Sequence, residues 1–308
     1  MTPTILTFGE ALIDFKQQDG LDFKGYEGGS PMNVAIAASR LGSAVGFGGQ
    51  VSSDLFGESL RSYLEENRVD TSFLLESERP STLAFVAEID GDAHFSFMGE
   101  GAADRHYDPQ PRPSLPASVT HIMFGSISLL YEPTSSSITD IIAAHQDSAV
   151  VVLDPNVRPA LTPDKDDYVR KLHGWVALAD IVKVSAQDLE WLYGERNPKA
   201  TAEDWLGRGP SAVLITDGGE GVTLYRSKQP PLKVKAPKVE VVDTVGAGDT
   251  FTGTLLSELS QRDELAALSD EAWSEVLNLA AHGAALNCTR DGADPPTRAE
   301  LDAFMKEA

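Results

Sequence analysis

The chain is poor in cysteine and in basic residues, and each shortage excludes classes of protein. Cys288 is the only cysteine among 308 residues, so no internal disulfide can form, which is typical of a reducing compartment. The 25 Lys and Arg residues stand against 47 Asp and Glu residues, which gives a formal net charge of −22. Because nucleic acids and anionic membranes are bound mainly through Lys and Arg, this charge argues against both partners.

Long hydrophobic runs are also missing. No run approaches the ~20 apolar residues that a membrane-spanning helix needs. The first five residues contain no basic segment followed by an apolar one, so they do not resemble a signal peptide. The apolar content of 42% is nevertheless enough for a sizeable core. We therefore expect a folded cytoplasmic protein.

Several common nucleotide-binding motifs are absent as well. No Lys follows a Gly anywhere in the chain, so the Gly-Lys-Ser/Thr of a Walker P-loop cannot occur. The protein-kinase motifs His-Arg-Asp and Asp-Phe-Gly are missing too. No Gly-x-Gly-x-x-Gly follows the first predicted strand, which argues against a dinucleotide-binding dehydrogenase.

Strand-like apolar runs alternate with helical segments along most of the chain. The near-continuous Val and Ile runs predict strands that are buried on both faces, as parallel strands are. Their alternation with helices predicts a doubly wound, mostly parallel α/β sheet. We expect strands at 5–15, 45–51, 121–125, 149–154, 181–184 and 212–216, and helices at 33–41 and 55–66.

One segment breaks this alternation. Residues 81–89 and 93–97 are predicted strands on either side of Asp90-Gly91-Asp92, and Asp-Gly between alternating apolar runs predicts a hairpin. A hairpin inside an α/β chain indicates a small β lid over a cleft, built from segments near 15–27 and 81–105. We expect a single domain over residues 1–308.

Polar residues at the ends of the predicted strands are the first candidates for a site, because doubly wound sheets bind ligands beyond the carboxyl ends of their strands. An Asp such as Asp14 can also be a turn or cap residue, and Arg158 can also be a surface charge. The candidates are Asp14, Asp154, Asn156, Arg158, Lys183, Ser185 and Asp217.

The strongest single segment lies between residues 241 and 256. We expect a β run that ends at Val242 and a helix that follows Asp249, with small residues between them. Small residues before a helix leave backbone N–H groups free to bind an anion, most often phosphate. An Asp at this place can cap the helix, or it can act as the base of a phosphoryl transferase beside the anion site.

Two segments resemble the signatures of the ribokinase-like (PfkB) family of carbohydrate kinases. The first runs from Gly28 to Ala35 and continues with Arg40-Leu41-Gly42, and the second runs from Asp243 to Phe251. Further segments are similar to fructokinases, at 9–15, 83–86, 125–129, 154–158 and 183–185. The similarity extends from residue 5 to 298 and implies the ribokinase-like fold over essentially the whole chain.

This resemblance implies that ATP phosphorylates a sugar hydroxyl, converting D-fructose to fructose 6-phosphate, with Mg²⁺ as cofactor. Asp249 would be the general base, and the backbone amides of Gly246, Ala247 and Gly248 would hold the transferring phosphoryl group. Asp104 would close over the sugar from the lid. The remaining sugar-binding residues would be Asp14, Gly28, Gly29, Asn33 and Arg158.

The resemblance also implies a nucleotide site and its ions. Asp188 would organise Mg²⁺ through water, and a monovalent cation such as K⁺ would lie near Asp243. The partners would be a sugar, ATP and, because lids in this family often pair between chains, a second copy in a homodimer. The nucleotide-binding residues would be Lys183, Ser185, Thr216, Gly218, Gly221, Ala281, Ala285 and Asn287.

Two departures from the fructokinase pattern leave alternatives open. Phe97-Met98-Gly99 stands where fructokinases usually have Phe-Tyr-Arg, and Ser185-Ala186-Gln187-Asp188 stands where the family has Asn-x-x-Glu. The first departure leaves open 2-keto-3-deoxygluconate, another ketose or a ribosyl compound as the acceptor. A sugar-binding regulator without catalysis is an alternative of another class.

Overall fold

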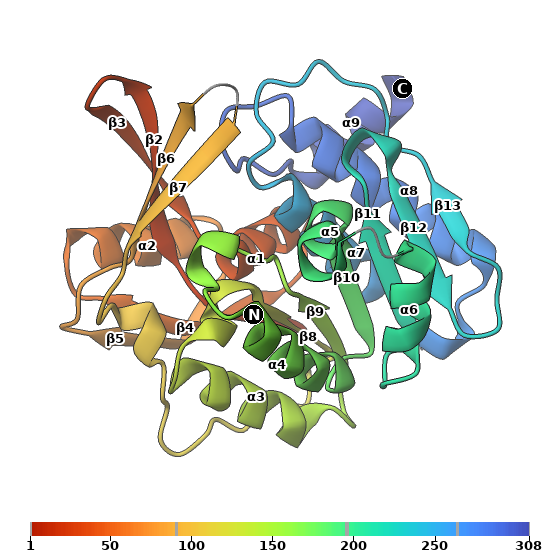
Figure 1. Cartoon of the computed structure of the whole chain (residues 1–308), viewed down its shortest axis with the longest axis horizontal. Coiled ribbons are helices and arrows are strands. Elements are labelled where there is room, and N and C mark those ends of the chain that lie inside the picture. Colours follow the sequence, from red (N-terminus) through yellow and green to blue (C-terminus); the bar gives the residue numbers. More distant parts are fainter. Residues whose placement is uncertain (1, 90–91, 195–196, 263–264, 308) are drawn as a thin grey trace.

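Two sheets organise the computed structural model, which describes residues 2–89, 92–194, 197–262 and 265–307. Over these residues the chain forms a nine-stranded sheet in the order β13-β12-β11-β10-β9-β8-β1-β4-β5 and a four-stranded sheet in the order β3-β2-β6-β7. Figure 1 shows the smaller sheet projecting from one end of the α/β domain as a lid. In this part of the chain, none of the helices has the length and composition of a membrane span.

The elements follow one another as an α/β series. The strands are β1 Ile5–Phe8, β2 Leu12–Asp19, β3 Asp22–Gly28, β4 Val45–Ser52, β5 Asp70–Ser77, β6 Leu83–Ile89, β7 Asp92–Met98, β8 His121–Gly125, β9 Val150–Asp154, β10 Ile181–Ser185, β11 Ala212–Thr216, β12 Val222–Arg226 and β13 Leu232–Val234. The helices are α1 Ser30–Arg40, α2 Leu55–Glu66, α3 Thr134–His145, α4 Lys165–Ala177, α5 Ala186–Tyr193, α6 Pro198–Leu206, α7 Ala247–Leu259, α8 Asp270–Asn287 and α9 Arg298–Glu307.

The large sheet is parallel from β5 to β11, and only β12 and β13 pair in an antiparallel way. Alternate strand residues face opposite sides, as the period of a strand requires. Ile5 and Val152 pack in one core with α1, α2, α7 and α8, whereas Leu6 and Val151 pack in a second core with α3 to α6. The predicted doubly wound α/β fold with strands buried on both faces is therefore confirmed.

The strand order reverses beside β1. The chain places β4 and β5 on one side of β1 and later places β8 to β11 on its other side. In sheets of this kind the crevice for ligands opens at such a reversal, beyond the carboxyl ends of the strands. The segments that follow β1 and β8 are therefore positioned to line a site.

The predicted strand over 5–15 is wrong in one respect, because two strands of different sheets share this segment. β1 ends at Phe8, and β2 begins at Leu12 in the lid. The break falls at Gly9, which has a φ of 154° and where a Cβ would lie 2.4 Å from Pro31 Cγ and 2.6 Å from Ser128 Oγ. No side chain fits there, so the chain can turn out of the large sheet toward the lid.

The hairpin that the sequence predicts is present in the smaller sheet. β6 pairs with β7 as an antiparallel hairpin and with β2 in parallel, and β2 pairs with β3. Residues 90 and 91 of the predicted turn lie outside the described residues. The lid is built from chain near both predicted segments, with its first strand starting earlier than expected.

Two further boundaries differ from the prediction. No strand runs up to Val242, because the described chain between Val234 and Gly246 has no regular structure, and the side chains of Val241 and Val242 are exposed. Helix α7 begins at Ala247, so Asp249 lies within its first turn rather than before it. The apolar Val241-Val242 pair predicts the end of a strand, but it lies in an irregular segment at the surface.

Helices α1 and α7 pack closely because Gly253 has no side chain. A Cβ at Gly253 would lie 2.5 Å from Ala37 Cβ and 2.8 Å from the Val34 carbonyl oxygen, and backbone cannot yield as a flexible side chain can. We expect Gly253→Ala to lower the free energy of unfolding by about 1–3 kcal/mol, measured by urea unfolding.

Gly174 offers the matched control for this substitution. It lies within α4, and a Cβ there would meet nothing within 4 Å. Gly174→Ala should therefore raise the free energy of unfolding by about 0.5–1 kcal/mol, through helix propensity alone. Equal effects of the two substitutions would show that the α1–α7 contact is not tight.

Candidate active site

Asp249 lies where the first turns of two helices meet. Its Oδ1 accepts a hydrogen bond from Ser30 Oγ at 2.7 Å, and its Oδ2 accepts one from Asn33 Nδ2 at 2.9 Å. Ser30 and Asn33 belong to the first turn of α1, and Asp249 to that of α7. Burial raises the pKa of Asp249 and Asp154 adds to this rise, although Ser30, Asn33 and Lys183 oppose it. The carboxylate is thus fixed in place, and the residue as a whole is half-buried.

The turn before Asp249 has the shape of an anion site. Gly246 caps α7 with a left-handed φ of 74°, and a Cβ there would lie 2.5 Å from Ala293 Cβ. The first intrahelical bond runs from the Thr250 N–H to the Gly246 carbonyl at 2.8 Å, so the N–H groups before it point out of the helix end. The Ala247 N–H is partly engaged, by the Thr244 carbonyl at 3.3 Å.

A buried ion pair lies directly beneath this turn. Lys183 Nζ is 2.8 Å from Asp154 Oδ2, with the two side chains 6% and 1% exposed. A Cβ at Gly248 would lie 3.0 Å from the same Nζ, which places the ammonium against the predicted anion site. Burial opposes the charge on Lys183, but Asp154, Asp249 and Asp188 raise its pKa. The fold therefore holds a permanent positive charge where phosphate oxygens would gather.

The predicted sugar residues gather on the lid side of Asp249. Burial raises the pKa of Asp14 to about 7, with Arg158 lowering it and Asp249 raising it, so Asp14 lies within reach of both charges. A Cβ at Gly28 would lie 2.2 Å from Asp14 Oδ2, so only Gly leaves this carboxylate in place. Gly29 has a φ of 107° and caps α1, the helix that carries Asn33.

Arg158 is held by its own loop. Its Nη1 donates to the Asn156 side-chain oxygen at 2.7 Å and to the carbonyl oxygens of Asn156 and Val157 at 3.3 and 3.2 Å. Asn156 adopts a positive φ of 38°, which bends the chain just beyond β9. The loop after β9 thus holds a guanidinium whose charge acts on Asp14.

Asp104, which is predicted to close over the sugar, lies just after the lid strands rather than within them. It lies in the 3₁₀ helix Ala103–His106, where it is buried and accepts a hydrogen bond from Thr82 Oγ1 at 2.6 Å. Burial raises the pKa of Asp104 to about 6. The resemblance assigns Asp104 to the sugar site, and the structure places it in the segment that follows β7, bonded to the residue directly before β6.

Glu10 is a buried acid that the sequence reasoning missed. The Ser128 N–H donates to its Oε2 at 3.2 Å, and the Ser128 hydroxyl contacts the same oxygen. Burial raises the pKa of Glu10 to about 7, opposed by Ser128 and Ser126 and reinforced by Asp104. Glu10 could have been identified as a candidate by its position directly after Gly9, just beyond the carboxyl end of β1.

Arg105 occupies the space that Gly99 leaves empty. A Cβ at Gly99 would lie 2.4 Å from Arg105 Nη2 and 2.8 Å from Thr82 Oγ1. The guanidinium carbon of Arg105 stands 3.9 Å from the ring centre of Tyr131, and its Nε is buried without a hydrogen-bond partner. A guanidinium is therefore present at the end of β7 even though residue 99 does not supply it.

The predicted nucleotide residues line the ends of β10 and β11. Ser185 and Thr216 are directly opposite each other in the sheet. Gly218 and Gly221 have positive φ values of 47° and 97°, and a Cβ at Gly221 would lie 2.1 Å from the Val234 carbonyl oxygen. The loop from Thr216 to Gly221 therefore depends on glycine, as a loop that must lie close to a ligand would.

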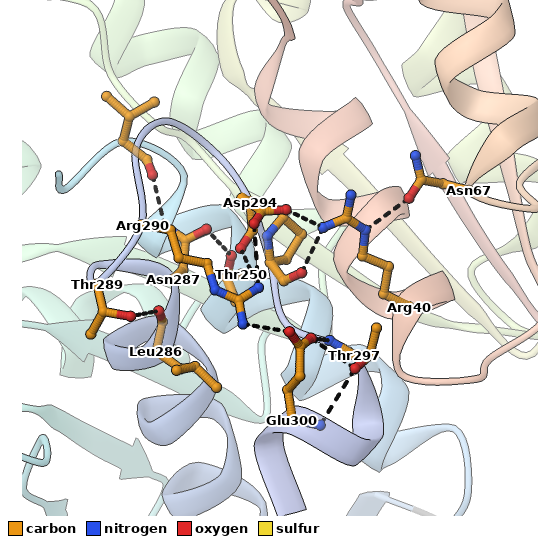
Figure 2. Close-up of polar contacts among 12 residues, drawn as sticks. Arg40, Asn67, Thr250, Leu286, Asn287, Thr289, Arg290, Asp294, Thr297 and Glu300 are labelled. Atoms are coloured by element: carbon orange, nitrogen blue, oxygen red, sulfur yellow. Dashed lines mark hydrogen bonds and ion pairs between the residues drawn. The ribbon is translucent and has the colours of Figure 1, made fainter. Parts of the chain in front are cut away.

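Asn287, by contrast, is committed to holding the chain in place. Its Nδ2 donates to the Val245 carbonyl at 2.8 Å, and its Oδ1 accepts from Thr250 Oγ1 at 3.2 Å, so it ties α8 to the turn before Asp249 (Figure 2). Ala281 and Ala285 are buried on the same helix. Asn287 thus supports the anion turn, and its predicted place in the nucleotide site stays a prediction.

A charged network supports the loop that follows α8. Arg290 contacts Asp294 at 3.3 Å and Glu300 at 2.8 Å, and Arg40 of α1 contacts the other oxygen of Asp294 at 2.5 Å (Figure 2). Arg40 also donates to Asn67 at 2.8 Å. The loop that packs against Gly246 is therefore held by both α1 and α9.

Asp188 has the role of a helix cap. The Asp188 N–H donates to Ser185 Oγ at 2.9 Å, and the Ser185 N–H donates back to Asp188 Oδ2 at 3.4 Å, which together form a capping box. Burial and the charge of Asp154 raise the pKa of Asp188, while Ser185 and Lys183 oppose the rise. In the part of the chain that the structure describes, no group of three His, Cys, Asp or Glu side chains could hold a metal ion.

The chain is similar to known sugar kinases over most or all of its length. A model described as pfkB family carbohydrate kinase matches residues 2–300. A fructokinase from Rhizobium leguminosarum bv. trifolii is 36% identical over 277 residues, covering 87% of this chain and 85% of the relative. The crystal structure of a fructokinase with bound ATP from Xylella fastidiosa has a TM-score of 0.89 and 31% identity, covering 100% of this chain and 99% of that chain. A fructokinase double mutant from Vibrio cholerae O395, in a form with bound fructose, ADP and potassium ion, has a TM-score of 0.88 and 26% identity over 98% of both chains.

Proposed function

The chain belongs to the pfkB family of carbohydrate kinases, and from this we propose that it transfers the terminal phosphoryl group of ATP to the 6-hydroxyl of D-fructose. The observation that carries the proposal is the placement of Asp249. Its carboxylate is held by Ser30 and Asn33 at the mouth of the glycine turn, with the Lys183 ammonium directly beneath that turn. A base, amide donors and a fixed positive charge thus meet at one point.

In this proposal Asp249 accepts the proton of the sugar hydroxyl as that oxygen attacks the phosphoryl group. The amides of Gly246 and Gly248 and the ammonium of Lys183 face the charge that develops on the transferring group. Because these donors are fixed by the fold before the reaction, they need no rearrangement in the transition state. Asp14, Gly28, Gly29, Asn33 and Arg158 hold the sugar hydroxyls, and the lid excludes water, a competing nucleophile.

The charges around Lys183 suit a magnesium ion that arrives with the nucleotide. In the described chain Asp154 Oδ1 is buried without a hydrogen-bond partner, and Asp188 lies close enough for the charge of Asp154 to raise the pKa of Asp188. We propose that Asp188 faces the ion through water. When bound, Mg²⁺ would neutralise charge on the phosphate oxygens. The homodimer and the cytoplasmic location stay predictions from the sequence.

A panel of acceptors in an ADP-release assay tests this function. D-Fructose should give the highest kcat/KM, and 2-keto-3-deoxygluconate, other ketoses and ribosides should give much lower values. NMR of the product should place phosphate on carbon 6. A different preferred acceptor would replace fructose within the kinase proposal, whereas ADP release at background with every acceptor would favour a sugar-binding regulator.

Arg105 bears on the choice of acceptor. We propose that its guanidinium supplies the sugar contact that the resemblance assigns to an Arg at position 99. Arg105→Ala should then raise KM for the sugar about 10- to 100-fold, the effect of removing one charged hydrogen bond, and leave KM for ATP unchanged. Gly99→Ala should act in the same direction by displacing the guanidinium.

The control for this prediction is Arg79→Ala, in the loop between β5 and β6. Arg79 is exposed, and its guanidinium donates a long hydrogen bond to the Gly101 carbonyl, at 3.5 Å. This variant should keep both KM values. Steady-state kinetics that show an unchanged sugar KM for Arg105→Ala would remove Arg105 from the sugar site.

A further inference from the structure

The lid is joined to the loops beside the anion turn through Lys16. This residue lies on β2, on the same face as Asp14 because two positions separate them. Its Nζ is 2.7 Å from Asp243 Oδ2 and 2.8 Å from Asp291 Oδ1. Tyr26 lies opposite Asp14 in the lid, donates to Asp291 Oδ2 at 2.5 Å and packs its ring 3.4 Å from the place of a Cβ on Gly292.

Asp243 is the residue at which the family resemblance implies a monovalent cation, but its carboxylate is already occupied by donors. Oδ1 accepts the Val245 N–H at 3.0 Å, and Oδ2 accepts the Gly292 N–H at 3.1 Å as well as the Lys16 ammonium. The neighbouring Val245 carbonyl accepts from Asn287 at 2.8 Å. The Asp243 side chain is 9% exposed, so little of it is left for another ligand. These residues do not fit a bound monovalent cation.

We propose that the Lys16 ammonium replaces the monovalent cation at Asp243 and thereby makes this chain independent of potassium. The inference rests on the kinase function proposed above and adds a residue to it. A protein-borne ammonium provides the same single positive charge as K⁺, and it does so from the lid rather than from solution.

Lys16 then acts as a positioning residue for the phosphoryl site. The ammonium holds Asp243, which holds the Val245 N–H directly before Gly246, the residue that caps α7. The charge needed to fix the anion turn is therefore delivered by the strand that also carries Asp14. The strand that contacts the sugar therefore also helps to order the phosphoryl site.

The test compares chloride salts of potassium, sodium and tetramethylammonium at equal ionic strength. For the natural chain, both kcat and the midpoint of thermal unfolding should be the same in the three salts. Lys16→Met should lower kcat about 10- to 100-fold in tetramethylammonium, as expected when a charged hydrogen bond is lost. Potassium should then restore part of this kcat and raise the unfolding midpoint of the variant. Lys16→Arg, which keeps the charge, should remain independent of potassium.

Lys24→Met is the matched control, because Lys24 is an exposed lysine of the same lid that lies 3.7 Å from Asp291 and 4.5 Å from the centre of the Tyr26 ring, whereas the ammonium at Asp243 Oδ2 is that of Lys16. It should keep the kcat and the salt independence of the natural chain. Activation of the natural chain by potassium, or a Lys16→Met variant that potassium neither activates nor stabilises, would overturn the inference. If no sugar is phosphorylated at all, the proposed function fails, and the unfolding midpoints still decide whether Lys16 replaces the cation.

Discussion

Replacing Asp249 with Asn should lower kcat by roughly 10²–10⁴-fold and leave KM for fructose and ATP nearly unchanged. Asn has the size of Asp, and its side-chain oxygen can still accept a hydrogen bond from Ser30 or Asn33, so the helix junction should survive. It cannot take up the proton of the attacking hydroxyl. Because the base is needed only in the transfer step, its removal should hardly change substrate binding.

Asp166→Asn provides the matched control for this substitution. Asp166 is also an acid in the first turn of a helix, α4, but it is exposed. The same change of charge there should leave kcat within experimental error of the natural chain. Steady-state kinetics that give Asp249→Asn a near-normal kcat would exclude Asp249 as the base.

Lys183→Met should lower the free energy of unfolding by about 3–5 kcal/mol, as measured by urea unfolding. The substitution leaves the Asp154 carboxylate buried with only the Thr252 hydroxyl beside it, at 3.2 Å from Oδ2. A buried charge without its partner cannot be solvated, and this accounts for the size of the expected loss.

The double variant Lys183→Met with Asp154→Asn should recover much of this stability, because it removes both charges together. It should stay as inactive as Lys183→Met, because the ammonium beneath the anion turn is missing from both. Additive losses of stability in the double variant would mean that the two side chains do not form the coupled pair seen here.

Local patterns predicted the parts of the fold that depend on local chemistry. Val and Ile runs predicted β8, β9, β10 and β11, and the small residues before Asp249 predicted the anion turn. The boundary between β1 and β2 could not be predicted from the apolar run through residue 15. The break depends on Pro31 and Ser128, which pack against Gly9 and are distant from it in the sequence. At Val241 and Val242 the error was the opposite, a strand predicted where none forms. Exposed hydrophobic residues cannot be told from those of a strand by their sequence alone.

Contacts between distant segments account for most of what could not be predicted at the site. Lys16 meets Asp243, 227 residues further along the chain, and no local pattern marks either as a partner of the other. Arg105 fills the space at Gly99 only because the chain folds back after β7. The part of Asp188 in the capping box could be read from its spacing of three residues from Ser185.

In the proposed reaction Asp249 takes the hydroxyl proton while the phosphoryl group is transferred. Rapid-quench measurement of a single turnover isolates this step, with enzyme in excess over labelled ATP and with saturating fructose. We expect Asp249→Asn to slow the transfer step itself by at least about a hundredfold, while calorimetry finds unchanged binding of both substrates. A transfer step as fast as that of the natural chain would show that Asp249 is not the base.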